Sequence, residues 1–246
     1  MNQLKKTPLN VLLIGNSQMG CWDLPAMISV MAESAPAGRP RINVGHALIG
    51  GKGLRGYWDA GTADFTPRAM IASARWDRVV IQEIYSARKR EFEDYAARFD
   101  DVIRRAGSIT IIFATAGITG YYRAGYRYPG SFVKLNDMQI AFGKKRGIPV
   151  AAAGYAWMRY LGQNPPKQQL LDLYDRDKGH PGPRGTYIYA CLLYAFITGS
   201  NPAGLAGKFE NIRRSGESSA PGVEIPAEEA GKMQRAAWDE YRGARQ

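Results

Sequence analysis

Residues 11–20 read Val-Leu-Leu-Ile-Gly-Asn-Ser-Gln-Met-Gly, and this stretch decides the fold class. Its apolar first half is typical of a strand that is covered on both faces, as in a parallel sheet flanked by helices. The apolar run stops at Gly15-Asn16-Ser17, which places a hydroxyl at the carboxyl end of the strand. Open α/β sheets hold their ligands at this edge. We therefore predict an α/β protein whose chemistry starts at Ser17.

Short apolar runs of the same kind recur along the chain and alternate with stretches of helical spacing. We expect strands at 9–15, 41–46, 77–84, 109–115 and 148–153, and helices between them at 22–34, 65–75, 91–106 and 131–146. Repeated β-α units predict parallel strands joined by right-handed crossovers.

The length and composition favour one domain. With 246 residues, 45% of them hydrophobic, the chain lies near the upper end of what a single domain holds. We expect one domain over 1–246, with a strongly apolar helix at 183–198. Residues 200–225 are rich in Gly, Ser and Pro and are expected to form a loop, and 226–241 to form a final amphipathic helix.

The charge is strongly basic, because 33 Lys and Arg residues outnumber 22 Asp and Glu residues and give a net charge of +11. These residues occur in short scattered groups, whereas a nucleic-acid surface is typically a longer stripe interleaved with aromatic residues. We therefore expect solvated helix faces and no nucleic-acid partner. Cys21 and Cys191 lie far apart and outside any metal-binding spacing, so we expect two buried thiols, no metal and no cofactor.

The residues near the N-terminus predict neither a membrane span nor a secretory core. Only Val11 to Ile14 are continuously apolar there, which is too short for either. A cytoplasmic location is the default expectation, although a trimmed secreted chain would look the same. The oligomeric state is not indicated by the sequence.

A serine hydroxyl acts as a nucleophile when a base lies beside it and a third group orients that base. The chain has two histidines, His46 and His180. His180 has Asp177 three residues before it, close enough in a turn to orient the ring, and this spacing favours Asp177 over its competitor Asp175. We predict that Ser17 is the nucleophile, His180 its base and Asp177 the orienting carboxylate, and that His46 is structural.

These two blocks resemble those of the SGNH (GDSL-type) hydrolases, in which a serine follows the first strand in a Gly-Asp/Asn-Ser motif and an Asp-x-x-His motif lies near the C-terminus. The resemblance implies a three-layer α/β/α sandwich with a five-stranded parallel sheet in flavodoxin-like order. It also implies metal-free acyl transfer, in which Ser17 attacks an ester carbonyl and His180 moves the proton to the leaving alcohol. Asp177 orients His180, and water resolves the acyl-enzyme.

Two further blocks of that family concern the oxyanion hole. Its glycine after the second strand is matched by Gly51, or alternatively by Gly50, whose backbone N–H would join that of Ser17 as a donor. The third block departs from the family, because most members have Gly-x-Asn-Asp where this chain has Gln82-Glu83. Gln82 carries the same carboxamide on a longer stem, and we expect it to be a third donor. Loss of such a donor lowers the rate about 10²–10³-fold.

Aromatic residues near these blocks are candidates for substrate binding. Tyr57 and Trp58 follow the second block, and Tyr121 and Tyr122 lie in the segment 117–129, which holds four tyrosines and two arginines. This composition suits stacking on sugar rings or holding an anionic group. The alternative is a packed loop without ligand contact.

The combined reading is a serine esterase, a carboxylic ester hydrolase, that acts on a small acyl ester, with an O-acetyl group on a carbohydrate as one candidate. One alternative is an acyltransferase that uses a sugar hydroxyl as acceptor. Another is a catalytically silent relative that binds a glycan or a protein. A flavodoxin-type phosphate site is disfavoured, because the loop 15–21 lacks the serial Ser and Thr donors that such a site prefers.

Overall fold

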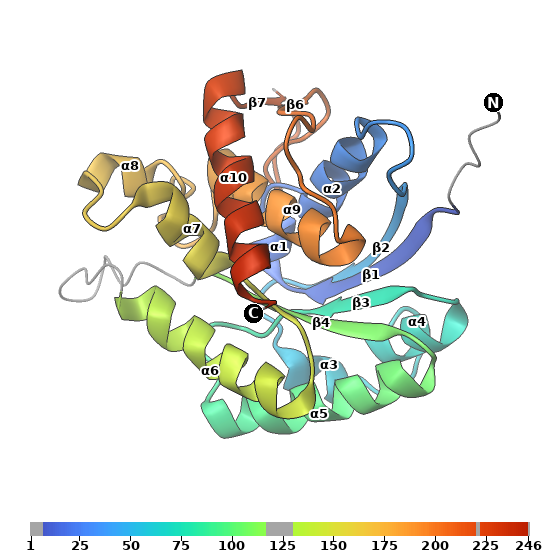
Figure 1. Cartoon of the computed structure of the whole chain (residues 1–246). Helices are drawn as coiled ribbons and strands as arrows, with labels where there is room; N and C mark the ends of the chain where they lie inside the picture. The colour runs from blue at the N-terminus through green and yellow to red at the C-terminus, as the bar shows by residue number, and fades with distance from the viewer. Residues whose placement is uncertain (1–6, 117–129, 220–221, 246) are drawn as a thin grey trace.

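The computed structural model describes residues 7–116, 130–219 and 222–245. A five-stranded sheet lies between two layers of helices (Figure 1). Its strands are β1 (Leu9–Gly15), β2 (Ile42–Leu48), β3 (Arg78–Ile81), β4 (Ile109–Ala114) and β5 (Val150–Ala152). Their order is β2-β1-β3-β4-β5, and every neighbouring pair is parallel. The predicted fold class and the flavodoxin-like strand order are confirmed.

The continuous apolar runs follow from burial of the sheet on both faces. On β1, Val11 and Leu13 pack into the core on one side, and Leu12 and Ile14 pack into the core on the other. All four side chains are fully buried. Because successive side chains of a strand point to opposite faces, a strand covered on both sides needs apolar residues at every position.

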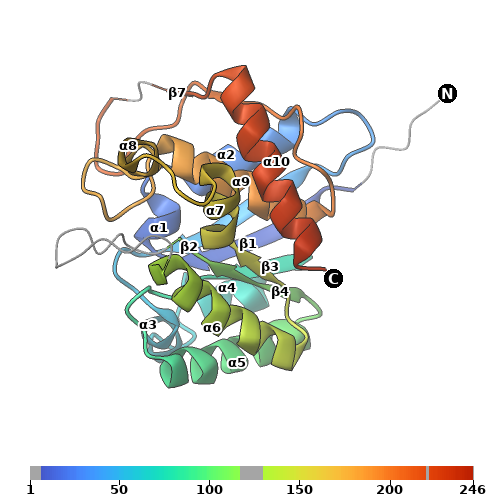
Figure 2. The same ribbon diagram turned by 60° about the vertical axis from the view of Figure 1, so that its left-hand side comes forward.

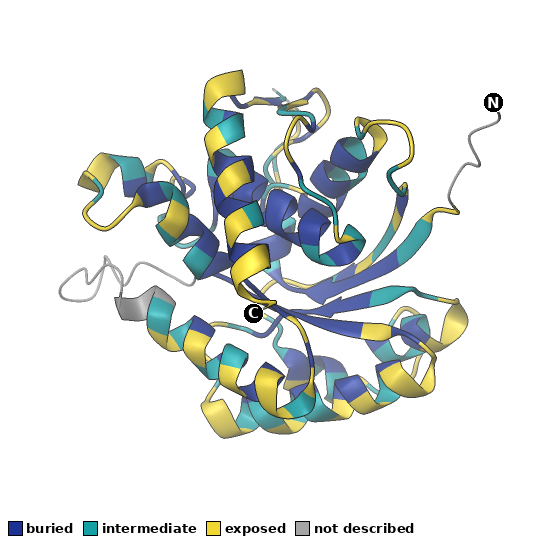
Figure 3. Ribbon diagram, viewed as in Figure 1, coloured by how far each residue is buried: buried dark blue, intermediate teal, exposed yellow. Residues whose placement is uncertain are grey.

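The helices form two layers, one on each face of the sheet (Figure 2). One layer contains α2 (Leu24–Glu33), α7 (Ala153–Leu161), α9 (Pro183–Thr198) and α10 (Ala227–Gly243). The other contains α3 (Leu54–Asp59), α4 (Pro67–Ser73), α5 (Lys89–Arg105) and α6 (Gly130–Arg146). Two short helices, α1 (Ser17–Gly20) and α8 (Lys167–Leu171), lie in the loops that follow β1 and α7. Figure 3 shows α9 almost wholly buried and α5 exposed along its outer side.

The segment that separates α9 from α10 is more ordered than expected. It was predicted to be a loop, yet β6 (Lys208–Phe209) and β7 (Val223–Glu224) pair in it as a small antiparallel sheet. The final helix also extends past the predicted end to Gly243. Strands of two residues leave no periodic signal that a sequence pattern can detect.

The helix α7 corrects another prediction, because it starts at Ala153, inside the run 148–153 that was expected to be a strand. The short helices α3 and α8 were also missed. A short run of Ala and Gly residues has no periodicity that separates a buried strand from a buried helix.

Cys21 and Cys191 are buried free thiols, as predicted. Within residues 7–116, 130–219 and 222–245, no helix combines the length and the apolar character that a membrane span requires. The same residues contain no cluster of three His, Cys, Asp or Glu side chains that could hold a metal ion.

Candidate active site

Ser17 lies at the carboxyl edge of the sheet, on the first residue of α1. The strand β1 ends at Gly15, and the side chain of Asn16 caps α1 by accepting the N–H of Gln18 at 3.0 Å. The turn is tight, because a Cβ on Gly15 would lie 2.7 Å from Oε1 of Gln82. A larger residue at this exit from the strand would have to displace the side chains of Gln82 and Met19, and Ser17, two residues on, is half-buried at the edge.

The structure brings Ser17, His180 and Asp177 together, although 163 positions separate the serine from the histidine. Nε2 of His180 lies 2.8 Å from Oγ of Ser17, and Nδ1 of His180 lies 2.8 Å from Oδ2 of Asp177. The other oxygen of Asp177, Oδ1, accepts the backbone N–H groups of Gly179 and His180, each at 2.9 Å. This turn, with Lys178 in the left-handed region at φ 56°, places the carboxylate of Asp177 against the ring of His180, and that ring faces the serine.

The electrostatics of Asp177 suit an orienting role. Burial would raise the pKa of its carboxyl, but the N–H groups of His180 and Gly179 and the His180 ring outweigh burial and lower that pKa to about 2. The carboxylate is therefore ionised and accepts the proton on Nδ1 of His180. With Nδ1 protonated, the lone pair of Nε2 faces the hydroxyl of Ser17, as a general base requires.

A pocket of about 270 Å³ opens at these residues. It is lined by Asn16, Ser17, Gly20, Cys21, Leu48, Gly50, His180, Arg214 and Ser215. Most of these come from the loop after β1, the end of β2 and the loop before α9, which meet at the carboxyl edge of the sheet. The other histidine, His46, is exposed on β2 and does not line this pocket.

The pocket lining distinguishes the two candidate glycines of the second block. Both glycines are exposed, but Gly50 lines the pocket beside Ser17, whereas the first choice, Gly51, at φ 70°, is not part of the lining. In the described part of the chain, the backbone N–H groups of Ser17 and Gly50 are paired with no acceptor. Both residues line the pocket.

Gln82 is placed differently from the expectation that it faces the pocket. It is fully buried, and Oε1 of its carboxamide accepts the backbone N–H of Asn16 at 2.9 Å. Its Nε2 donates to the backbone carbonyl of Glu83. The side chain lies beneath the turn that carries the serine and does not line the pocket, so its position supports that turn.

Tyr57 is a correction to the predicted substrate-binding set. Its ring is fully buried, and its hydroxyl accepts the N–H of Ile49 at 2.7 Å and donates to the carbonyl of Gly15. These contacts tie the end of β2 to the end of β1. Tyr57 therefore holds the two loops of the pocket together and offers no surface to a ligand.

Trp58 is a second correction, because it packs between helices on the other face of the sheet. Its ring meets Phe99 edge-on at 5.5 Å, and the guanidinium of Arg68 lies 4.5 Å from the ring centroid. Trp58 is not among the residues that line the pocket at Ser17. The other two candidates, Tyr121 and Tyr122, lie outside the described residues.

Sequence reasoning missed Arg214, which lies in the segment expected to be a loop. Its guanidinium bonds Oδ2 of Asp175 at 2.6 Å and Oδ2 of Asp177 at 3.1 Å. Asp175, the competitor for the orienting role, contacts Arg214 and Trp22 with its carboxylate and reaches His180 only through a backbone hydrogen bond. No pattern in the sequence distinguishes this half-buried arginine from the other basic residues.

Glu83 is buried next to the site, with only 3% of its surface exposed. Its Oε1 accepts the N–H of Leu54 at 3.1 Å, at the start of α3, and that of Ile84 at 2.7 Å. Burial raises the pKa of Glu83 to about 7, and the two N–H groups only partly oppose this effect. Glu83 thus caps α3, where Gly53 provides no side-chain cap.

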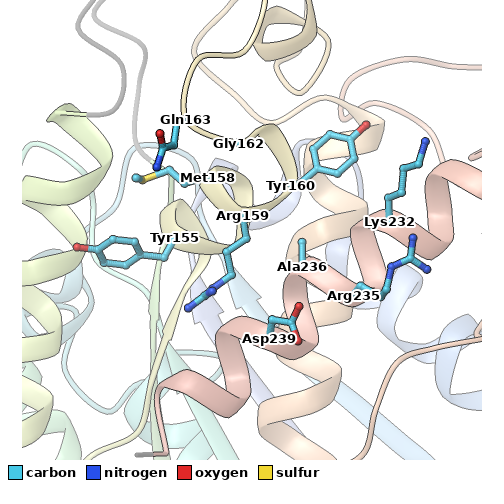
Figure 4. A pocket seen from close by; sticks show the side chains of 10 residues that line it. All are labelled: Tyr155, Met158, Arg159, Tyr160, Gly162, Gln163, Lys232, Arg235, Ala236 and Asp239. Atoms are coloured by element: carbon cyan, nitrogen blue, oxygen red, sulfur yellow. The ribbon is translucent and has the colours of Figure 1, made fainter.

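A larger pocket of about 750 Å³ lies between α7 and α10 (Figure 4). It is lined by Tyr155, Met158, Arg159, Tyr160, Gly162, Gln163, Lys232, Arg235, Ala236 and Asp239. This lining contains no serine, cysteine or histidine, so it offers no nucleophile with a base. The smaller pocket is the candidate active site, because it alone of the two holds the hydrogen-bonded serine and histidine.

Comparison with known proteins gives likenesses of structure and none of sequence. No family model matches this chain, and no curated protein matches it. A protein from Slackia heliotrinireducens provisionally assigned as an SGNH hydrolase is similar with a TM-score of 0.59 at 20% identity, over 76% of this chain and 97% of that one. Axe2, an acetylxylan esterase from Geobacillus stearothermophilus, is similar with a TM-score of 0.57 at 15% identity, over 76% and 93% of the two chains.

The acetyl xylan esterase AlAXEase is similar as well, with a TM-score of 0.55 at 12% identity, over 77% of this chain and all of that one. The chain therefore has the fold of the SGNH hydrolases, as the resemblance in its motifs implied.

Proposed function

We propose that this protein is a serine esterase that hydrolyses small acyl esters through an acyl-enzyme on Ser17. The observation that carries the proposal is the continuous hydrogen-bonded line from Oγ of Ser17 through the ring of His180 to Asp177, with 2.8 Å at each step. A nucleophile, a base and an orienting carboxylate at these distances form the arrangement that activates a serine. The fold shared with SGNH hydrolases supports the same conclusion.

In the proposed reaction, Oγ of Ser17 forms a bond to the ester carbonyl carbon while its proton passes to Nε2 of His180. Asp177 stabilises the resulting imidazolium through Nδ1. The tetrahedral intermediate then collapses, and its C–O bond to the alcohol breaks as His180 returns the proton to the leaving oxygen. Water repeats the sequence on the acyl-enzyme and releases the acid and free Ser17.

The negative oxygen of the intermediate needs donors that are already in place. The backbone N–H groups of Ser17 and Gly50 are the donors that we assign to it, because both lie at the pocket wall. Donors fixed before the reaction stabilise the developing charge without reorganisation, and one donor is worth about 10²–10³-fold in kcat.

The pocket favours a short acyl group. Its volume of about 270 Å³ is smaller than the roughly 300–1,000 Å³ typical of pockets for drug-sized ligands. Leu48 and Cys21 supply apolar wall, and burial raises the pKa of the Cys21 thiol to about 12, so that this thiol stays neutral. We propose an acetyl ester as substrate and an O-acetylated carbohydrate as its class, in line with the acetylxylan esterases of the same fold.

The test is hydrolysis of p-nitrophenyl acetate, butyrate and octanoate by the wild type and by Ser17→Ala and His180→Ala. Removal of either residue should lower kcat by about 10⁴–10⁶-fold, and the rate should fall with acyl length. Ser73→Ala and His46→Gln, both exposed and outside the pocket, are the matched controls. Unchanged hydrolysis by the Ser17 variant would refute the proposal. Acetate release from acetylated xylooligosaccharides tests the substrate class separately.

A further inference from the structure

We propose that Arg214 is a positioning residue for the catalytic carboxylate: it fixes the plane of Asp177 and so holds His180 in line with Ser17. The consequence for turnover rests on the proposed esterase function. The Asp177–His180 hydrogen bond that Arg214 sets is present in the protein without substrate, so it can be tested apart from turnover.

The two oxygens of Asp177 are held from opposite sides. Oδ1 is fixed by the backbone of its own turn, through the N–H groups of Gly179 and His180. Oδ2 accepts Nδ1 of His180 at 2.8 Å and also Nη2 of Arg214 at 3.1 Å. Arg214 is the anchor on Oδ2 that is independent of the His180 ring, and together with the two N–H groups on Oδ1 it fixes the plane of the carboxylate.

The charges around Arg214 leave Asp177 able to stabilise an imidazolium. Asp175 is buried and accepts Nε of Arg214 at 2.6 Å, and it also accepts Nε1–H of Trp22 at 3.4 Å. Arg214 and Asp175 together are neutral, so the cluster of Asp175, Arg214 and Asp177 keeps one negative charge beside His180. The planar guanidinium suits this arrangement, because its Nε–H reaches one carboxylate and its Nη2–H reaches the other.

The segment around Arg214 is attached to both catalytic loops. The backbone N–H of Ser215 donates to the carbonyl of Cys21 at 2.8 Å, directly after the helix that starts with Ser17. On the other side, Nη2 of Arg176 bonds Oε1 of Glu217 at 2.7 Å, next to Asp177. The segment thus links the serine loop to the histidine loop, and Arg214 is the part of it that reaches Asp177.

The kinetic test compares Arg214→Ala and Arg214→Lys with Arg213→Ala. Arg213 is the matched control, because it is exposed and carries the same charge one residue away, with its bond directed to the carbonyl of Ser218. We expect Arg214→Ala to lower kcat by about 10–100-fold, with KM little changed, because Asp177, the group that Arg214 holds, does not line the pocket and acts on the reaction through His180. Arg214→Lys should recover little of the kcat that Arg214→Ala loses, because an ammonium cannot bridge both carboxylates in a plane.

Removal of Asp175 tests the chain of contacts behind Arg214. Asp175→Ala should lower kcat in the same direction, and the double variant Asp175→Ala/Arg214→Ala should be no slower than Arg214→Ala alone. If the losses in kcat from the two substitutions add up in the double variant, Asp175 and Arg214 do not act through one series of contacts. A rise in KM with kcat unchanged would also overturn the proposal, because it would make Arg214 a substrate-binding residue.

A spectroscopic measurement separates this inference from the esterase proposal. The chain has only two histidines, so ¹⁵N-histidine labelling gives signals from two imidazole rings, and His46→Gln assigns them. The Nδ1 proton of His180, held by Asp177, should give a low-field resonance in the wild type and in Arg213→Ala.

That resonance should be broadened or lost in folded Arg214→Ala and in Arg214→Lys, with folding checked by thermal unfolding. A resonance that persists unchanged in both variants would overturn the positioning role, whatever the activity. If Ser17→Ala retained full esterase activity, the proposed function would fail while this measurement still decided the role of Arg214.

Discussion

The strands β1 and β3 lie side by side and end at the same edge of the sheet, and each is followed by a pair of polar residues. After β1 come Asn16 and Ser17, and the hydroxyl of Ser17 lies at the pocket against His180. After β3 come Gln82 and Glu83, which are 0% and 3% exposed and bind backbone groups. Neighbouring strand ends thus hold the proposed nucleophile in one case and structural supports in the other.

The difference arises because the turn after β1 passes over the end of β3. The N–H of Gln82 donates to the carbonyl of Ile14 at 2.8 Å, and its side chain then accepts the N–H of Asn16 above it. The turn after β1 faces the pocket, and the turn after β3 is covered by the turn after β1. A polar residue at the end of a parallel strand is therefore a candidate for chemistry, and its neighbours decide whether it meets substrate.

The largest expected effect on kcat concerns the end of β1, where the proposed nucleophile and its partners lie. Asp177→Asn keeps the shape of the side chain but removes the charge that orients His180, and an equivalent change lowers kcat by about 10⁴-fold in the serine proteases. We expect a loss of that order for this protein, measured with p-nitrophenyl acetate, with thermal stability retained. A loss below about tenfold would show that the carboxylate is dispensable.

The next largest effect concerns stability and the buried polar residues at the end of β3. Gln82→Leu leaves the N–H of Asn16 and the carbonyl of Glu83 buried without their partner, and each such group costs about 1–3 kcal/mol. We expect the free energy of unfolding to fall by about 2–5 kcal/mol, measured by urea denaturation, with Gln168→Leu as the exposed control. A fall in kcat with unchanged stability would instead show that Gln82 serves as an oxyanion donor.

Glu83 provides a pH-dependent test of the same supports. Burial raises its pKa from an ordinary 4.5 to about 7, so the folded state retains the proton to a higher pH than the unfolded chain does. Wild-type stability should therefore fall as pH rises from about 4.5 to about 7 and then stay level with respect to this group.

Glu83→Gln has no such titration and keeps an acceptor oxygen for Leu54 and Ile84. The stability of this variant relative to the wild type should grow over that pH window by on the order of 3 kcal/mol. The measurement is urea denaturation of both proteins at intervals between pH 4 and pH 8 (about the window set by the two pKa values). A difference that is constant with pH would show that Glu83 titrates normally.

The smallest expected effect is at Tyr57. Tyr57→Phe removes a hydroxyl that joins Gly15 to Ile49, and loss of these hydrogen bonds should lower stability by about 1–2 kcal/mol, with KM for acetyl esters unchanged. Thermal unfolding and steady-state kinetics on the same preparation check this result. An increase in KM without loss of stability would return Tyr57 to the substrate-binding residues.

By itself the sequence determined the class of the fold and the central residues of the candidate site. The strand β1 was predicted with its observed bounds, because a strand covered on both faces is apolar at every position. Gly15-Asn16-Ser17 and the Asp177 to His180 spacing act over a few residues, so their local geometry follows from the chain alone. The α7 helix was not predictable in this way, since its first residues carry no periodic pattern.

The tertiary structure alone decided which polar groups share a pocket and which are covered. The contact of Arg214 with Asp177 joins residues 37 positions apart, and the burial of Gln82 depends on a turn 66 positions away. Such contacts depend on how the loops cross at the sheet edge. Residue type and local spacing carry no information on that crossing, because it is set by the packing of helices onto both faces of the sheet.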